Sequence, residues 1–469
     1  MKPFTKFAIG LAFFFISTIS LFSQEIVGTW QGVLKVQGVE LEIVFHIDEQ
    51  NSQYTSLMDS PTQGAFDIPT TKTTFKDNQL EIVVANLGAF YQGKLHNDTI
   101  TGTFNQSGMP FHLTLVSAEK KKLLRPQEPK APYPYEVEEV TFTNTKEKID
   151  LAGTLTLPRQ AEKFATVILI AGSGPNDRDE TIFAHKPFWV LADYLTRQGI
   201  AVLRYDKRGI GESEGEYFTA TTKDFAEDVE AAISYLKTRK EIDYKNIGLI
   251  GHSEGGIIAP MVAAVNSDVK YFVLMAGLGV TGTELVLAQH HHEFDKLPLT
   301  DEKKEDLNDN LIDLYSNVMN WREYAGSDEE RNKLKEDLGK LWQNLSLETQ
   351  GETQKDVFIK QTTAKIISPW FRYFLKTDPT AYIQMLSIPV LAIIGQNDTQ
   401  VEYQSNLDGI EKALKRANNK QYSIKSYPNL NHLFQESTTG EIDEYGKIEQ
   451  TFSPIVMSDM AKWIKQQVK

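Results

Sequence analysis

The sequence has 469 residues, with 49 Lys and Arg against 63 Asp and Glu, so its formal net charge is −14. This charge excludes a nucleic-acid binder that relies on bulk positive charge. The chain contains no cysteine, which excludes disulfides, thiolate catalysis and a lipid-modified N-terminal cysteine. The hydrophobic content of 41% is typical of a globular protein.

Residues 1–23 have the pattern of a signal peptide. Lys2 and Lys6 precede an uncharged, mostly apolar stretch at residues 7–22, and small residues follow near Ser23. A membrane-spanning helix needs about 20 apolar residues, and no later segment approaches that length. We therefore expect an exported protein without a membrane span, periplasmic or extracellular after cleavage near Ser23. The alternative is an uncleaved N-terminal anchor.

Residues 24–118 are predicted to form a small all-β domain. Short apolar and β-branched segments alternate in this region, and turn residues such as Asn97 and Asp98 separate them. The opening, with Gly28 and Trp30, resembles the Gly-x-Trp start of lipocalin-like barrels, which would imply a small-molecule pocket. In the alternative interpretation Trp30 is an ordinary core residue, and the domain shapes or anchors its neighbour.

Residues 119–137 are rich in proline and charged residues, and we interpret them as a domain linker. A different sequence pattern begins after them. Short apolar runs such as residues 165–171 are typical of strands covered on both faces, and amphipathic helical patterns lie between them. This alternation predicts an α/β fold with a doubly wound, mostly parallel sheet, built from residues 138–277 and 387–469.

The alternation of strands and helices stops for residues 278–386, which are mostly helix-forming and densely charged. Ligands of a doubly wound sheet bind at the carboxyl ends of its strands. An insertion at this point of the chain is therefore expected to form a helical lid above that edge.

Two stretches match Gly-x-Ser-x-Gly, one around Ser213 and one around Ser253. A nucleophile elbow needs a buried strand that ends at the first glycine and a helix with small residues after the serine. Only Ser253 has both, because the apolar residues 247–250 precede it and a Gly- and Ala-rich segment follows. We therefore predict Ser253 as a nucleophile, with a coincidental tight turn as the alternative.

A serine hydroxyl needs a base within hydrogen-bond reach and an acid that fixes the tautomer of that base. His432 lies in a polar loop after a strand-like segment, and Asp398 ends an apolar strand earlier in the chain. The order Ser, acid, His is the one that α/β-hydrolase folds use. We predict His432 as the base and Asp398 as the acid. The alternatives are an exposed loop histidine and a turn-forming aspartate.

Catalysis by a serine also requires hydrogen-bond donors for the negative charge of the tetrahedral intermediate. A loop of small residues at positions 171–175 follows a predicted strand, and we expect the backbone NH groups of Ser173 and Glu254 to form the oxyanion hole. The rival interpretation is a phosphate cradle. The loop lacks the third glycine of a dinucleotide-binding loop, and Asp177 and Asp179 would repel phosphate. We therefore expect no cofactor.

From about Tyr135 onward the chain resembles secreted serine α/β-hydrolases, a group of acyl esterases and serine-aminopeptidase-like hydrolases. The blocks that carry this resemblance are residues 171–179, 204–213, 368–374 and 432–435. The resemblance implies the α/β-hydrolase fold and hydrolysis of carboxylic esters or related acyl bonds. It does not name the substrate.

The lid segment holds two further groups of interest. Trp370, Phe371 and Tyr373 are candidate substrate-binding residues that would line an acyl pocket, and they would equally serve as lid core. His290, His291 and His292 are adjacent, and neighbouring side chains on a helix point about 100° apart. They cannot all face one ion, so we expect no metal site.

The favoured interpretation is a serine hydrolase that cleaves a small acyl ester through an acyl-enzyme intermediate. One alternative is a serine peptidase that removes small N-terminal residues, with Glu284 or Glu293 of the lid holding the substrate's ammonium group. A second alternative is a ligand- or surface-binding protein in which the β-domain has the main role. The sequence predicts neither the natural substrate nor the oligomeric state.

Overall fold

The computed structural model describes residues 26–36, 39–51, 53–106, 108–119, 124–159, 162–321, 326–345 and 352–468. The predicted signal peptide lies outside the described residues. The chain divides into two compact units, one mainly of residues up to Lys120 and one mainly of residues from Lys121 onward. We call them the β unit and the α/β unit. Among the helices that the structure describes, none is long and apolar enough to cross a membrane.

The described part of the β unit is a nine-stranded sheet in the order β4-β3-β2-β1-β9-β8-β7-β6-β5. Its strands are β1 Gly28–Val36, β2 Val39–Gln50, β3 Gln53–Ser60, β4 Ala65–Pro69, β5 Lys72–Lys76, β6 Gln79–Val84, β7 Ala89–His96, β8 Thr99–Gln106 and β9 Met109–Ala118. Every second residue of β6, from Leu80 to Val84, is buried, as a sheet with one covered face requires. Trp30 is 4% exposed in this core, and its indole NH donates to the carbonyl oxygen of Ile26.

The α/β unit contains an eight-stranded sheet in the order β10-β11-β13-β12-β14-β15-β16-β17. The pairs β10–β11 and β11–β13 are antiparallel, and the remaining pairs are parallel. The strands are β10 Glu136–Asn144, β11 Ile149–Leu157, β12 Phe164–Ile170, β13 Ala201–Tyr205, β14 Ile242–His252, β15 Val269–Met275, β16 Val390–Gly395 and β17 Tyr422–Tyr427.

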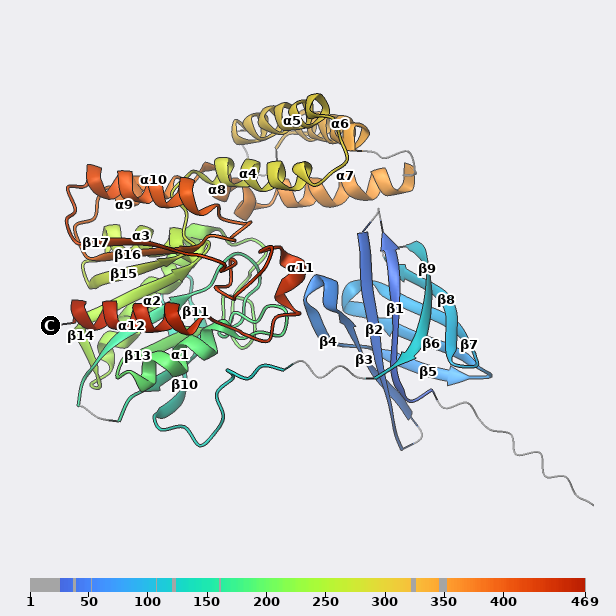
Figure 1. The fold of residues 1–469 in the computed structure, drawn as a ribbon, viewed down its shortest axis with the longest axis horizontal. Helices are drawn as coiled ribbons and strands as arrows, with labels where there is room; N and C mark the ends of the chain where they lie inside the picture. The colour runs from blue at the N-terminus through green and yellow to red at the C-terminus, as the bar shows by residue number, and fades with distance from the viewer. Residues whose placement is uncertain are drawn as a thin grey trace, which may run out of the picture. The chain divides into compact units, whose positions relative to one another are not determined.

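Helices cover both faces of this second sheet (Figure 1). Val167 and Leu169 of β12 pack in one apolar cluster with α1 Pro187–Arg197 and α12 Pro454–Gln467. Ile168 and Ile170 point to the other face, into a cluster that contains residues of three further helices. Those helices are α2 Thr222–Thr238, α3 Gly255–Val265 and α10 Tyr403–Arg416. Successive residues of the strand thus enter opposite cores, which explains its continuous apolar sequence.

A group of helices follows β15 and precedes β16. We call them the lid: α4 Gly282–Asp295, α5 Asp301–Met319, α6 Asp328–Leu345, α7 Glu352–Ile366, α8 Pro369–Lys376 and α9 Pro379–Ile383. In Figure 1, α4 to α7 (yellow to orange) are gathered on one side of the sheet. The predicted fold class is confirmed: a doubly wound, mostly parallel sheet with a helical insertion and an N-terminal all-β part.

Part of the predicted linker is bound to the α/β unit. Besides the carbonyl oxygen of its neighbour Leu124, the guanidinium group of Arg125 donates to four carbonyl oxygens from distant parts of the chain, those of Phe183, Ala184, Gly446 and Ile448. The side-chain oxygen of Gln127 accepts from the backbone NH groups of Thr451 and Phe452. These bonds satisfy backbone groups that would otherwise lack partners, so this stretch is a fixed strap rather than a free spacer.

Candidate active site

Ser253 lies at a sharp turn between β14 and α3. Its backbone is left-handed, with a φ of 53°, which is strained for a residue with a side chain and is typical of a nucleophile elbow. A Cβ atom on Gly251 would lie 2.0 Å from the carbonyl oxygen of Gly255, and one on Gly255 would lie 2.1 Å from that of Ile170. Packing therefore requires glycine at both positions, and the turn presents Ser253 at the carboxyl end of β14.

Ser213, in the other Gly-x-Ser-x-Gly stretch, has a different environment. Its hydroxyl donates to the carbonyl oxygen of Asp206 at 2.7 Å and accepts from the backbone NH of Ala152 at 2.9 Å. The residue is only 8% exposed. Ser213 therefore fixes a loop, and its hydroxyl is not available to attack a substrate.

His432 and Asp398 form a buried pair, 4% and 5% exposed. Nδ1 of His432 lies 2.8 Å from Oδ2 of Asp398. Oδ1 of Asp398 accepts from the backbone NH groups of Gln400 and Val401, which fixes the carboxylate. A carboxylate at Nδ1 favours the tautomer with its proton on that nitrogen, and Nε2 is then free to accept a proton.

Ser253 and His432 line one cavity of about 450 Å³, a size common for small-molecule sites. From the core, its wall includes Gly172, Ser173, Glu180, Thr399, Gln400 and Leu433. From the lid, it includes His290, Glu293, Lys365, Trp370, Phe371 and Phe374. The structure describes both Ser253 and His432 but shows no hydrogen bond between them. Such bonds are often long in the absence of substrate.

The predicted oxyanion loop passes directly beside the nucleophile. A Cβ atom on Gly172 would lie 3.1 Å from Cβ of Ser253. The side-chain amide of Asn176 donates to the carbonyl oxygens of Gly172 and Ser173, which holds the loop in this shape. In the described parts of the chain, the backbone NH groups of Ser173 and Glu254 donate to no other group. Both remain available to an incoming oxygen.

A buried pair that the sequence analysis did not identify lies behind the site. Oε1 of Glu180 accepts from the backbone NH of Gly172 at 2.6 Å and lies 2.9 Å from Nδ1 of His252. Nε2 of His252 lies 3.0 Å from the carbonyl oxygen of His432. Burial acts to lower the pKa of His252, but the Glu180 carboxylate outweighs it and the pKa is raised. The pair joins the oxyanion loop, the elbow and the histidine loop.

The side chain of Glu254 belongs to a second buried network. Oε1 of Glu254 accepts from Oγ1 of Thr222 and from the indole NH of Trp370, both at 2.7 Å. Nζ of Lys207 lies 3.5 Å from Oε2 of Glu254 and donates to the carbonyl oxygen of Gly172 at 2.5 Å. Burial lowers the pKa of Lys207. This network connects α8 of the lid to the residue that follows the nucleophile.

The family model described as "Serine aminopeptidase, S33" matches residues 187–437, more than half of the chain. The chain belongs to this S33 family. The strands and helices described above have the α/β-hydrolase arrangement that the resemblance of the motifs implied.

Two curated relatives match over different lengths of this S33 hydrolase. The chain is 28% identical to esterase EstD of Thermotoga maritima over 318 residues, which cover 67% of this chain and 65% of EstD. It is 32% identical to protein YfhR of Salmonella typhimurium over 128 residues, or 27% of this chain and 40% of YfhR. The chain thus spans less than two thirds of the length of each relative.

Two solved structures that resemble this chain come from Pyrococcus furiosus and Pseudomonas aeruginosa. An esterase of Pyrococcus furiosus, Pf2001, gives a TM-score of 0.42 at 19% identity, covering 74% of this chain and 98% of that one. The hypothetical protein PA2218 of Pseudomonas aeruginosa gives 0.45 at 18% identity, covering 74% and 99%.

The predicted substrate-binding residues of this S33 hydrolase lie in two places. Trp370 and Phe371 line the cavity together with Phe374, because these three positions share one face of α8. Tyr373 lies on another face and lines a separate cavity with Tyr382 and other residues. Trp370 and Phe371 therefore remain candidates for substrate contact, and Tyr373 does not reach the candidate active site.

The lid acids considered for ammonium recognition already have partners. Oε2 of Glu284 accepts from the backbone NH and hydroxyl of Thr281, which completes a capping box at the start of α4. Glu293 lines the cavity, but its Oε1 accepts from Nζ of Lys296 at 2.8 Å.

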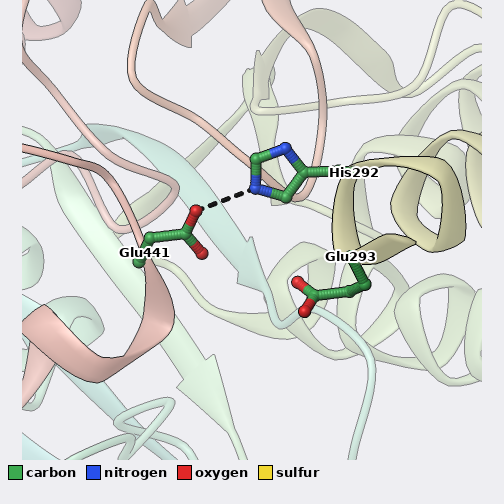
Figure 2. A group of neighbouring side chains, drawn as sticks. All are labelled: His292, Glu293 and Glu441. Carbon is green, nitrogen blue, oxygen red and sulfur yellow. Dashed lines mark hydrogen bonds and ion pairs between the residues drawn. The ribbon is translucent and has the colours of Figure 1, made fainter. Parts of the chain in front are cut away.

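His292, Glu293 and Glu441 form a cluster in which one ligand atom of each lies within 4.8 Å of the others (Figure 2). Nε2 of His292 is 2.9 Å from Oε1 of Glu441. Nζ of Lys296 donates to Glu293 at 2.8 Å and to Glu441 at 2.6 Å, so an ammonium already supplies positive charge to both carboxylates. We interpret the cluster as an ion-pair network that joins α4 to the segment before α11 Ile442–Tyr445.

Proposed function

We propose that this S33 hydrolase cleaves carboxylic esters through an acyl-enzyme intermediate. Ser253 is the nucleophile, His432 the general base and acid, and Asp398 the residue that orients His432. The observation that supports this most is the cavity that Ser253 of the elbow, Ser173 of the small-residue loop and His432 line together, with His432 bound to the buried Asp398. Each element has a defined role in acyl transfer, and the arrangement contains all of them.

Acylation starts with attack of Oγ of Ser253 on the acyl carbon while Nε2 of His432 takes the hydroxyl proton. The oxygen of the tetrahedral intermediate carries the negative charge and accepts from the NH groups of Ser173 and Glu254. The bond to the alcohol then breaks, and His432 gives its proton to the leaving oxygen. Asp398 stays ionised and stabilises the imidazolium that forms in between.

Deacylation repeats these steps with water as the nucleophile. His432 takes a proton from the water, the hydroxide oxygen bonds to the acyl carbon, and the ester bond to Ser253 breaks. The proton returns to Oγ of Ser253, and the carboxylic acid leaves. The bulky leaving group of an ester and the incoming water occupy the same side of the cavity, next to Nε2.

The peptidase alternative has less support than ester cleavage. An enzyme that removes N-terminal residues needs an acid to hold the substrate's ammonium group, and Glu284 and Glu293 are both engaged with other groups. The cavity wall also carries Lys365, whose positive charge would repel an ammonium. The name of the relative EstD, an esterase, agrees with this choice.

Treatment with a fluorophosphonate followed by intact-mass measurement tests the nucleophile. We expect a single adduct on the wild type, none on Ser253→Ala, and an adduct on Ser213→Ala, the matched control from the other Gly-x-Ser-x-Gly stretch. An adduct that persists on Ser253→Ala would contradict the proposal. Rates with p-nitrophenyl acetate and with amino-acid p-nitroanilides then separate esterase from peptidase. We expect turnover of the ester and inertness toward the anilides.

A further inference from the structure

Lys365 is a cation in the wall of the candidate active site. It lies in the last turn of α7, and its side chain lines the cavity that also contains Ser253 and His432. Its Nζ lies 5.3 Å from the ring centroid of Phe371, another wall residue. The side chain thus lies beside an apolar residue of the lid and is exposed to solvent.

Both acids in the cavity wall have a basic partner, although Glu293 shares Lys296 with Glu441. Of the two acids in the wall, Glu180 is paired with His252 and Glu293 with Lys296. Lys365 forms no ion pair with any residue that the structure describes. Burial lowers its pKa, as expected for a cation that no carboxylate stabilises.

The histidine beside Lys365 does not supply a counter-charge. Burial and, next, the charge of Lys365 lower the pKa of His290 to about 4, so His290 is neutral at neutral pH. Nε2 of His290 lies 2.8 Å from the hydroxyl of Tyr315, which fixes the ring. Lys365 is therefore a cation of the cavity wall that pairs with no carboxylate of the described residues, and the apolar side chains of Trp370 and Phe371 line the same wall. Lys365 is exposed at this wall, so an anion there would meet a cation that has no carboxylate partner, in an interaction that solvent partly screens.

We infer that Lys365 binds a carboxylate of the substrate, so that the enzyme prefers esters that carry a negative charge. This inference rests on the proposed function, because it concerns the substrate of the same site. Trp370, Phe371 and Phe374 would contact the hydrocarbon between the reacting carbonyl and the carboxylate. The carboxylate can belong to the acyl part or to the alcohol part, and both give the same contact with Nζ.

Matched pairs of esters test the preference and distinguish the two sources of the carboxylate. On the acyl side, mono-p-nitrophenyl adipate is compared with methyl p-nitrophenyl adipate. On the alcohol side, 4-acetoxybenzoate is compared with its methyl ester. We expect kcat/KM to favour the charged member in at least one pair, mainly through KM, since the contact is present already in the ground state. No preference in either pair, with the neutral esters hydrolysed, would overturn the inference and leave the proposed function intact.

Three variants assign the preference to this residue. In Lys365→Met, which keeps the length of the side chain, the charged-to-neutral ratio of kcat/KM should fall about tenfold or more, as for a lost hydrogen bond to a charged group. Lys365→Arg should restore most of the ratio. Lys360→Met removes an exposed lysine from the same helix and should leave the ratio unchanged. Equal losses for both members of a pair in Lys365→Met would mean that Lys365 only supports the lid, and would overturn the inference.

A binding measurement keeps the test independent of turnover. Calorimetric titration of Ser253→Ala with monomethyl adipate and with dimethyl adipate should give tighter binding of the charged ligand. The added change Lys365→Met should remove the difference. If no ester were hydrolysed but the charged ligand still bound more tightly than the neutral one, the proposed function would be contradicted and the recognition of the carboxylate would be supported. Equal binding of the two ligands would overturn the inference whatever the turnover.

Discussion

At the scale of single residues, the candidate site depends on two buried pairs of a histidine and a carboxylate. Asp398 orients His432, whose other ring nitrogen is left for the reacting groups. Glu180 binds His252, which lies behind the site and holds the carbonyl oxygen of His432. Removing one partner of a buried pair is costly because the other is left without a counter-charge. The two pairs therefore differ in role but share this sensitivity.

Replacing Asp398 with asparagine should lower kcat/KM for esters by about 10³- to 10⁴-fold. The amide group would donate to Nδ1 of His432 and so favour the tautomer with a proton on Nε2, which cannot accept the proton of Ser253. Rates with p-nitrophenyl acetate and thermal melts check this result. Asp378→Asn is the control, since Asp378 only caps α9 and asparagine caps equally well. Turnover of Asp398→Asn near the wild-type rate would contradict the assigned role.

Replacing Glu180 with glutamine should destabilise the protein most at low pH. The pKa of His252 is raised in the folded protein. The charged His252–Glu180 pair therefore stabilises the folded state fully at pH values below the unfolded pKa of about 6.5. That contribution is lost as the pH rises through the folded pKa. The difference in Tm between wild type and Glu180→Gln should therefore be largest in acid and shrink toward alkaline pH. Melts across this range check the sign, and a difference that grows with pH would contradict it.

At the scale of elements, the lid is bound to the core at Glu254, the residue that follows the proposed nucleophile. The indole NH of Trp370, in the first turn of α8, binds the carboxylate of Glu254, which also accepts from Thr222 at the start of α2. Lys207 extends this contact to the oxyanion loop through Gly172. These bonds link α8 to Glu254 and, through Lys207, to Gly172, the two segments proposed to form the oxyanion hole.

Trp370→Phe should weaken this attachment. The change removes a donor from a buried carboxylate, which costs about 1 to 3 kcal/mol of unfolding free energy, and it loosens α8 at the cavity, so KM for esters should rise. Denaturant unfolding and ester kinetics measure the two effects. Trp189→Phe, on α1, is the control and should leave KM unchanged. Loss of stability without any change in KM would mean that the bond is structural only.

The sequence analysis recognised elements better than the contacts between them. The α/β fold was predictable because its strands are continuously apolar and its helices amphipathic, and both patterns are local. Ser253 and His432, each after a strand-like segment, were predicted from local sequence, and the structure places both at one cavity. Glu180 gave no such signal, and the block with Lys207 did not show its contacts, since both residues bind partners far away in the chain. Tyr373 was misplaced because the sequence of α8 does not show which face of a short helix meets the cavity.

At the scale of the whole molecule, the β unit and the α/β unit have separate hydrophobic cores. All the residues proposed for catalysis belong to the α/β unit, and so does the strap with Arg125, which binds backbone groups of that unit. Trp30 is a buried core residue of the β unit, as the alternative interpretation of its motif stated. We therefore expect hydrolysis of a small ester to depend on the α/β unit.

Removing residues 24–118 should leave kcat/KM for p-nitrophenyl acetate within about twofold of the full chain. The proposed catalytic residues all lie in the α/β unit, which has its own hydrophobic cores. The strap must be retained, since the shorter chain with Arg125→Ala would expose four backbone carbonyls of the α/β unit and should melt at a lower temperature. Circular dichroism shows whether the shortened protein is folded. A folded protein without activity would mean that the β unit completes the site. Retained activity with lost binding to a macromolecule or surface would instead assign it a targeting role.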